Sequence, residues 1–372
     1  MGTNPTIHKA TILALVVLPL LATLGAVILL WERYVFWSDI ALLLAFYAIS
    51  AMGVTIGFHR MLTHDGFKAP AWLRGLILIC GSMAFEGAPD MWTATHVKHH
   101  AHSDDDDDPH SPLHGFWHAH MGWLLNRGSF APVGQYAPHL LEDPVVRFVS
   151  RYILVWMGLS LLIPFLLGGW TGLIWGGGVR IFLTTHVTWS VNSVCHTFGR
   201  RPFQTTDESR NEWVVGLLAF GEGWHNNHHA FPRNAFHGMR WWQFDLSGVV
   251  IRFLELAGLA WDVERVSPQA VEAHRRHAEL STAKVAEMRD QLAASIAAAK
   301  QELWTMMQAS LTPMQKSRLE AMRVELESRL NDMQATLAKA QNLKRRKLAA
   351  YRAEIQRMLE EAKAASRELA AA

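Results

Sequence analysis

The stretch ATILALVVLPLLATLGAVILL, residues 10–30, decides the fold class of this chain. It contains no charged residue, and at about 1.5 Å per residue it is long enough to cross a hydrocarbon core of roughly 30 Å. Further apolar runs cover residues 40–58, 148–167 and 170–191. We therefore predict an all-α membrane protein with four transmembrane helices, rather than a soluble protein with two buried helix hairpins.

Charge indicates how these helices are oriented. The two short connections hold one basic residue, Arg33, whereas many lysines and arginines flank the opposite ends of the runs. The positive-inside rule then places both termini and the segment 59–147 in the cytoplasm. A shorter apolar stretch, residues 72–85, is expected to lie at the membrane interface. Arg180 falls inside the fourth run, so it must face protein or a polar cavity.

The composition changes at residue 262, where Ala, Glu, Lys, Arg and Gln become dominant. We predict a membrane domain with a cytosolic helical cap over 1–261 and a polar helical extension over 262–372. Prolines at 268 and 313 follow hydroxyl residues and predict two helix starts. A partial heptad of Leu and Met follows the second start. The extension could fold as a helical hairpin or pair with another chain as a coiled coil, and both readings stay open.

Cysteine and net charge exclude several classes of function. The chain has two cysteines, Cys80 and Cys195, which exclude a disulfide-stapled secreted fold and a cysteine-ligated metal site. Its formal net charge of +2 does not suggest nucleic acid as a partner. Histidine is the unusual residue, with 20 in the chain.

The histidines form spaced groups at the cytoplasmic ends of the predicted helices. The patterns are His-x₄-His, then His-x-x-His-His twice, and a single histidine that closes the fourth run. Positions i, i+3 and i+4 share one face of a helix, so each triplet can direct three imidazoles to one point. Nine imidazoles suit two ions with five or six ligands each, and neutral imidazole accepts zinc, copper, iron or nickel. The nine are His59, His64, His96, His99, His100, His196, His225, His228 and His229.

Several short motifs between Phe46 and Asp245 accompany these groups. They are Asp108-Pro-His, Gly115-Phe-Trp-His, Gly122-Trp-Leu-Leu, Asn192-Ser-Val-Cys-His196, Gly199-Arg-Arg-Pro, Ser209-Arg-Asn and Asn226-Asn-His-His-Ala-Phe-Pro232. Together with the order of the histidine groups, this pattern resembles the membrane fatty-acid desaturases, in particular the stearoyl-CoA (Δ9) type.

The resemblance implies a fold, a cofactor and an activity. It implies a cytosolic cap that holds two irons per chain, with the nine histidines as iron ligands and Asn192 holding a metal-bound water. The implied reaction is the O₂-dependent insertion of a cis double bond, at Δ9, into a saturated acyl chain of about 18 carbons. The chain contains no ferredoxin-, rubredoxin- or cytochrome b5-like segment, so electrons must come from a separate protein.

The resemblance also implies a substrate tunnel. Residues matching its kink are Trp92, Thr188 and Trp189, while Tyr47 and Ala51 match the pair that sets chain length. Glu86 stands near the kink where vertebrate members have Gln.

Three residues bear on the carrier of the acyl chain. Ala94 and Thr95 replace an Arg-Asp pair that helps to hold coenzyme A in vertebrate members, although Arg127 remains. Acyl-CoA is the first expectation, with acyl carrier protein or a lipid-linked chain as alternatives.

An aspartate run, residues 104–108, follows the second histidine group. Asp108, in its Asp-Pro-His motif, is the candidate to orient a ligand imidazole through a carboxylate hydrogen bond. The other four aspartates could orient imidazoles, dock a basic electron donor, or form a solvated loop.

Two other functions fit the histidines. A membrane hydroxylase of lipids or alkanes uses a similar framework, although Asn192 and the short third box favour desaturation. A histidine-rich metal transporter or sensor would instead need polar residues inside the membrane runs.

Overall fold

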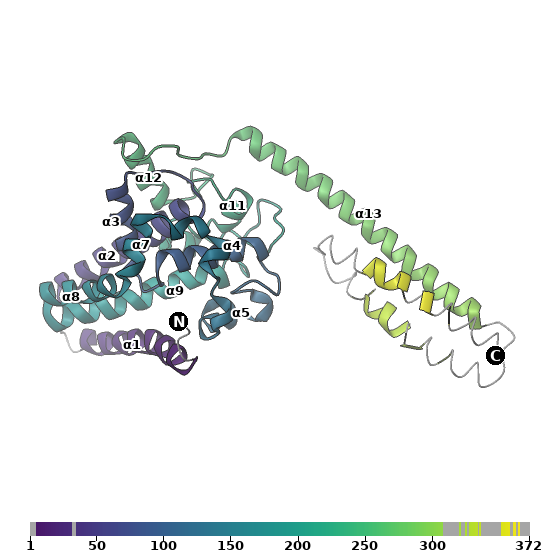
Figure 1. Ribbon diagram of the computed structural model, residues 1–372, viewed down its shortest axis with the longest axis horizontal. Coiled ribbons are helices and arrows are strands. Elements are labelled where there is room, and N and C mark those ends of the chain that lie inside the picture. The colour runs from purple at the N-terminus through teal and green to yellow at the C-terminus, as the bar shows by residue number, and fades with distance from the viewer. Residues whose placement is uncertain are drawn as a thin grey trace. The chain divides into compact units, whose positions relative to one another are not determined.

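The computed structural model describes residues 5–31 and 35–307, together with residues 320, 324–325, 327–333, 335, 351–357, 360–361 and 364 (Figure 1). The chain divides into two compact units, Met1–Val271 and Glu272–Ala372. The boundary expected from composition, between residues 261 and 262, stays a prediction. The described residues form helices and loops without any β-strand, as expected of an all-α protein.

Apolar helices form one side of the first unit. Helix α1 (Pro5–Trp31) packs on the π-helical η6 (Leu173–Val179), and α2 (Trp37–Met52) continues directly into a second π-helical segment, η1 (Gly53–Thr63). Among the described residues, three helical stretches are long and apolar enough to cross a membrane: Thr6–Leu30, Trp37–Thr63 and Ile153–Ser193.

The third of these stretches reverses its direction at Gly169. It contains α8 (Ile153–Gly172), η6 and α9 (Arg180–Ser193). Gly169 adopts φ 61° and ψ −146°, a conformation that favours glycine. The residues after it pack back on those before it, since a Cβ on Gly176 would lie 2.9 Å from the Cβ of Pro164. This hairpin corresponds to the third and fourth predicted runs, and a membrane crossing by each arm stays a prediction.

Arg180 lies inside this hairpin and is completely buried. Its guanidinium donates hydrogen bonds to the carbonyl oxygens of Gly176, Met83 and Ser160 and to the Ser160 hydroxyl. The charge therefore faces protein, as its position in an apolar run required.

The remaining helices of the first unit surround the ends of the apolar helices. The stretch expected at the membrane interface forms α3 (Ala71–Ser82), which packs closely on η1, because a Cβ on Gly53 would lie 2.0 Å from the backbone nitrogen of Gly81. Its buried leucines join Phe58 and Ile251 in the main hydrophobic core. The other α-helices are α4 (Pro89–His102), α5 (Phe116–His120), α6 (Val133–Tyr136), α7 (Pro144–Arg151), α10 (Trp213–Leu218), α11 (His225–Ala230) and α12 (Leu246–Leu256). Short 3₁₀ turns cover Pro112–His114, Gly122–Leu125, Arg127–Ser129 and Pro138–Leu141.

The tail begins with α13 (Pro268–Met307), whose first turn is capped as the sequence predicts: the Ala270 N–H donates to the Ser267 hydroxyl. Within the second unit, Leu292 and Ile296 of α13 are buried, as are Leu330 and Ile355. Lys300 donates to the Asn331 side chain at 2.7 Å, so a later segment folds back along α13. The predicted helix start at Pro313 and most of the partial heptad lie outside the described residues.

Candidate metal centre and cavity

Four segments bring the nine predicted histidines together. His59 and His64 lie at the end of η1, and the His-x-x-His-His triplets lie on α4 and α11. His196 follows α9. In η1 the His64 N–H donates to the His59 carbonyl, five residues earlier, as in a π-helix. This wider turn places the two rings 4.8 Å apart, which the α-helical spacing would not do.

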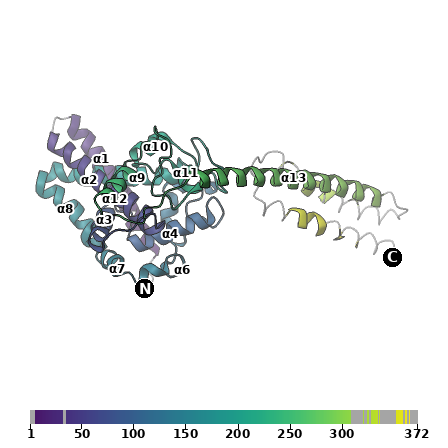
Figure 2. The ribbon, with the colours of Figure 1, turned by 90° about the horizontal axis from the view of Figure 1, so that it is seen from above.

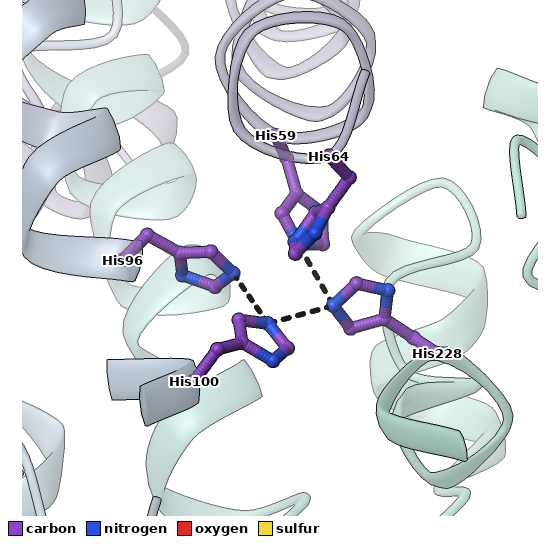
Figure 3. A group of neighbouring side chains, drawn as sticks. All are labelled: His59, His64, His96, His100 and His228. Carbon is purple, nitrogen blue, oxygen red and sulfur yellow. Dashed lines mark hydrogen bonds between the residues drawn. The ribbon is translucent and has the colours of Figure 1, made fainter. Parts of the chain in front are cut away.

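The first histidine group contains His59, His64, His96, His100 and His228. Figure 3 shows their imidazoles converging from three segments. The Nε2 atoms of His59 and His100 lie 3.1 and 3.0 Å from Nε2 of His228, and those of His96 and His100 are 3.1 Å apart. Ligand atoms about 2.1 Å from one ion and near a right angle to each other are separated by about 3 Å, so these distances fit a bound metal.

The second histidine group contains His99, His196, His225 and His229. Its candidate ligand atoms all lie within 4.8 Å of one another, with Nε2 of His196 and His225 separated by 3.0 Å. The sequence-predicted histidines thus form two adjacent groups of five and four.

Buried carboxylates hold the outer nitrogen of four of these imidazoles. Nδ1 of His59 lies 2.5 Å from Glu222, Nδ1 of His99 lies 3.0 Å from Asp108, Nδ1 of His196 lies 3.0 Å from Asp104, and Nδ1 of His229 lies 2.7 Å from Asp207. A carboxylate that accepts from Nδ1–H leaves Nε2 as the ligand atom and makes it more basic. In the described part of the chain, Nε2 of His99 and of His229 are buried without a hydrogen-bond partner. These orphaned atoms face their group and fit the requirement of a metal ion.

The aspartate loop supplies two of these carboxylates. Asp104 and Asp108 are buried, whereas residues 105–107 are exposed. Asp104 has φ 58°, and its N–H donates to Asp108 at 2.8 Å. The loop therefore turns back on itself and presents its first and last carboxylates to two different histidines.

The electrostatics of the site favour ionised carboxylates and, at several positions, neutral imidazoles. His99 is an exception, because burial lowers its pKa but Asp108 and the other nearby aspartates raise it by more. Burial, and then the neighbouring histidines, lower the pKa of His100, His225 and His228 well below the usual range. Burial raises the pKa of Asp207, but the interaction with His229 lowers it by a larger amount. The pKa of Asp207 therefore lies below its usual value. Neutral nitrogens are the form that binds a metal.

A buried charge network beneath the first histidine group was missed by the sequence analysis. Arg60 donates to Glu222 and to Asp245, at 3.0 and 2.9 Å. Glu222 is also 3.3 Å from Nδ1 of His237, whose ring lies 4.6 Å from that of His228. Glu222 lies three residues before His225 of the third histidine group. Its link to Arg60, 162 residues earlier, has no local signal in the sequence.

A cavity of about 510 Å³ adjoins the histidines, a volume typical of ligand pockets. His59, His96 and His225 line it, together with Asn192. All seven predicted substrate residues also line it: Tyr47, Ala51, Glu86, Trp92, Arg127, Thr188 and Trp189. Asn192 and the seven thus line one cavity beside the histidines, and their individual roles stay proposals.

Aromatic and polar groups shape this cavity. The Trp92 ring stacks on His96 at 5.0 Å, and the Tyr47 hydroxyl donates to the Leu218 carbonyl at 2.7 Å. Burial raises the pKa of Glu86 to about 8, although the nearby Trp189 and Thr188 side chains lower it. One Glu86 oxygen has no hydrogen-bond partner among the described residues.

Helix α1 adds a wall to the cavity that sequence reasoning did not foresee. His8, Ile12 and Leu15 line the cavity, and Nε2 of His8 contacts the Leu124 carbonyl at 3.0 Å. Their spacing of four and three residues would have indicated one helical face, but the face of an apolar helix that meets lipid and the face that meets substrate look alike in sequence.

The described residues combine apolar helices, two buried histidine groups that could hold metal and an adjoining cavity. This organisation fits a membrane-associated enzyme with a metal centre. The chain belongs to the fatty acid desaturase family, whose model matches residues 35–252. It is therefore an oxidoreductase of lipid metabolism.

Characterised relatives share much of this region. The chain is 44% identical over 231 residues to the sn-1 stearoyl-lipid 9-desaturase of Anabaena variabilis, covering 61% of this chain and 85% of that protein. It is 39% identical over 280 residues to the hex-5-enoyl-[acyl-carrier protein] acetylenase of Moorena producens (70% and 87%). It is 41% identical over 244 residues to the acyl-CoA C20 Delta5-desaturase of Anemone leveillei (64% and 77%).

Proposed function

We propose that this protein is an O₂-dependent di-iron desaturase that inserts a cis double bond at Δ9 of a saturated acyl chain of about 18 carbons. The observation that carries the proposal is the placement of both histidine groups beside one cavity lined by Tyr47, Trp92 and Trp189. The overall reaction takes one O₂, two electrons and two protons, and it converts a –CH₂–CH₂– unit to –CH=CH– with release of two water molecules.

The nine histidines would hold two irons, with Asn192 as a further contact on the cavity side. Bound iron supplies the oxidising power that breaks unactivated C–H bonds. The role of the chain itself is to position the C–H bonds of the acyl chain near the metal centre. Trp92 stacks on His96, so its indole forms part of the cavity wall directly against a ligand imidazole. Buried carboxylates on four imidazoles would orient the rings and leave Nε2 as the atom that holds the metal.

We further propose that four helices cross the membrane, with both termini and the metal centre in the cytoplasm. The hairpin at Gly169 supports two crossings within residues 153–193. The positive charge flanking the histidine-bearing ends supports the orientation.

We propose that the acyl chain is carried on a membrane lipid, with acyl-CoA, the first expectation from the sequence, and acyl carrier protein as alternatives. Arg127 is the one arginine or lysine among the described residues that line the cavity, whereas coenzyme A carries several phosphate charges. Several relatives are named for a lipid-linked acyl chain, which supports a lipid carrier, whereas others are named for a carrier-protein or coenzyme A ester. Electrons would come from a separate ferredoxin-, rubredoxin- or cytochrome b5-like protein.

Expression in a desaturase-deficient host tests the activity. We expect monounsaturated C18 fatty acids from the parent protein and none from a His228→Ala variant. Mass spectrometry of the dimethyl disulfide adducts of these fatty acids would locate the double bond. A hydroxylated acid would favour the hydroxylase, and retained zinc or copper instead of iron would favour a transporter or sensor.

Purified protein with a reducing partner tests the carrier. Stearoyl groups presented as phospholipid or glycolipid, as coenzyme A ester or as carrier-protein ester can be compared at equal acyl concentration. Faster conversion of the coenzyme A ester than of the lipid would contradict the lipid carrier while leaving the desaturase activity intact.

A further inference from the structure

Three segments of the cap expose large apolar side chains to their surroundings. They are α10, residues 241–244 and α12, which together we name the apolar cap surface. On α12, Val249, Phe253 and Leu256 are exposed at spacings of four and three residues and form one stripe along the helix. Trp241 is 97% exposed. Neighbouring exposed apolar side chains of this kind mark a site of contact with a membrane, a ligand or another protein.

Short contacts place the three segments next to one another. Trp224 joins the first two: it packs on Gly216 of α10, its ring lies 5.6 Å from that of Trp242, and its indole N–H donates to the Phe244 carbonyl. A backbone hydrogen bond joins the start of α12 to the loop that follows α10: the Ser247 N–H donates to the Phe220 carbonyl at 3.0 Å.

This surface is attached to a helix that is apolar enough to cross a membrane. The Leu218 carbonyl, at the end of α10, accepts from the Tyr47 hydroxyl, and the Ser247 hydroxyl lies 2.7 Å from that of Thr55. Tyr47 and Thr55 both belong to the stretch Trp37–Thr63. Helix α12 also lies beside α3, the predicted interfacial helix, in both views (Figures 1 and 2).

We propose that the apolar cap surface rests in the interfacial region of the bilayer that the long helices cross. The inference rests on the proposed membrane topology and commits to lipid as the occupant, because α10 and α12 are both hydrogen-bonded to a predicted span. The apolar cap surface contains three exposed tryptophans, Trp213, Trp241 and Trp242. Tryptophan is enriched at membrane interfaces because its ring is apolar and its N–H is polar. At the edge of the α12 stripe, Arg252 and Glu255 form an ion pair at 2.6 Å, as expected where the helix surface turns from lipid to water.

The proposal has a consequence for the cavity. Ala219, the residue directly after α10, lines the cavity, while Leu217 and Leu218 are exposed on the apolar cap surface. Contact with lipid therefore holds the segment 217–219 in place as a wall of the cavity, beside Tyr47.

Spin labelling in phosphatidylcholine vesicles tests the proposal. The chain has only Cys80 and Cys195; Cys195 is buried, and Cys80→Ala removes the other site. Labels are placed through Leu217→Cys and Phe253→Cys, and relaxation by oxygen is compared with relaxation by a water-soluble nickel chelate. Two reference labels calibrate the scale: Leu154→Cys on α8, 78% exposed, and Asp106→Cys in the exposed aspartate loop.

We expect the labels at 217 and 253 to favour oxygen, as the label at 154 does, while the label at 106 favours the nickel chelate. Labels at 217 and 253 that favour nickel would overturn the proposal, as would dipolar broadening between two copies at low protein density, which would indicate a dimer surface. If the label at 154 also favours nickel, the membrane topology itself fails, and the two failures are thereby distinguished.

Discussion

Replacing Glu86 by Gln tests whether this carboxyl group is held neutral inside the cavity. Burial raises its pKa from 4.5 to about 8. The unfolded chain therefore releases this proton at a lower pH than the folded chain, and stability is lost as the pH rises from about 4.5 to about 8. One pH unit in this interval costs about 1.4 kcal/mol, so from pH 5 to pH 7.5 the loss is up to about 3 kcal/mol. Gln does not titrate, so the Glu86→Gln variant does not undergo this loss of stability.

Thermal unfolding in detergent, followed by tryptophan fluorescence, measures this effect. We expect Glu86→Gln to unfold at a temperature close to that of the parent at pH 5 and several degrees higher at pH 7.5. Glu142→Gln makes the same chemical change at an exposed position and should show no such pH-dependent gain. A gain for Glu86→Gln that is equal at both pH values would refute the argument, because it could not arise from ionisation.

Three further changes test other parts of the structure. Ala51→Trp should fill the cavity beside Tyr47 and shift the products to shorter acyl chains; an unchanged chain-length profile in the host lipids would contradict this role. Asp207→Asn should weaken metal retention against a chelator by about 10–100-fold, measured by elemental analysis, whereas the same loss in the exposed control Asp106→Asn would show that charge alone is responsible. Arg180→Leu leaves several buried carbonyl oxygens unpaired and should lower stability by about 3 kcal/mol; a variant with parental unfolding temperature would mean that water replaces the guanidinium.

The grouping of the histidines could be predicted because its signals are local. Each histidine triplet repeats at helical spacing, so the direction of its imidazoles follows from the sequence. The seven cavity residues came from the family resemblance, which carries three-dimensional information that spacing alone lacks. The ligand and substrate roles of these residues stay predictions.

The contacts that organise the site were harder to foresee because they join distant segments. Glu222 pairs with His59 and Arg60 across more than 160 residues, and His237 enters the same network from a loop. A carboxylate that holds an imidazole has the same identity and local pattern as one that is solvated, as the aspartate loop shows. The π-helical form of η1 also has no simple sequence signature, although it brings His59 and His64 together.

The aspartate loop limits how this protein can be altered. Its two ends hold His99 on α4 and His196 after α9, so the number of residues between Asp104 and Asp108 sets the separation of two attachment points. The three exposed aspartates in between can change identity without moving either end, but an added residue must displace one carboxylate from its imidazole. For protein engineering, we therefore expect this loop to tolerate substitutions but not insertions. An epitope inserted in the loop should reduce the amount of metal that the protein binds, whereas the same epitope placed in the tail should not.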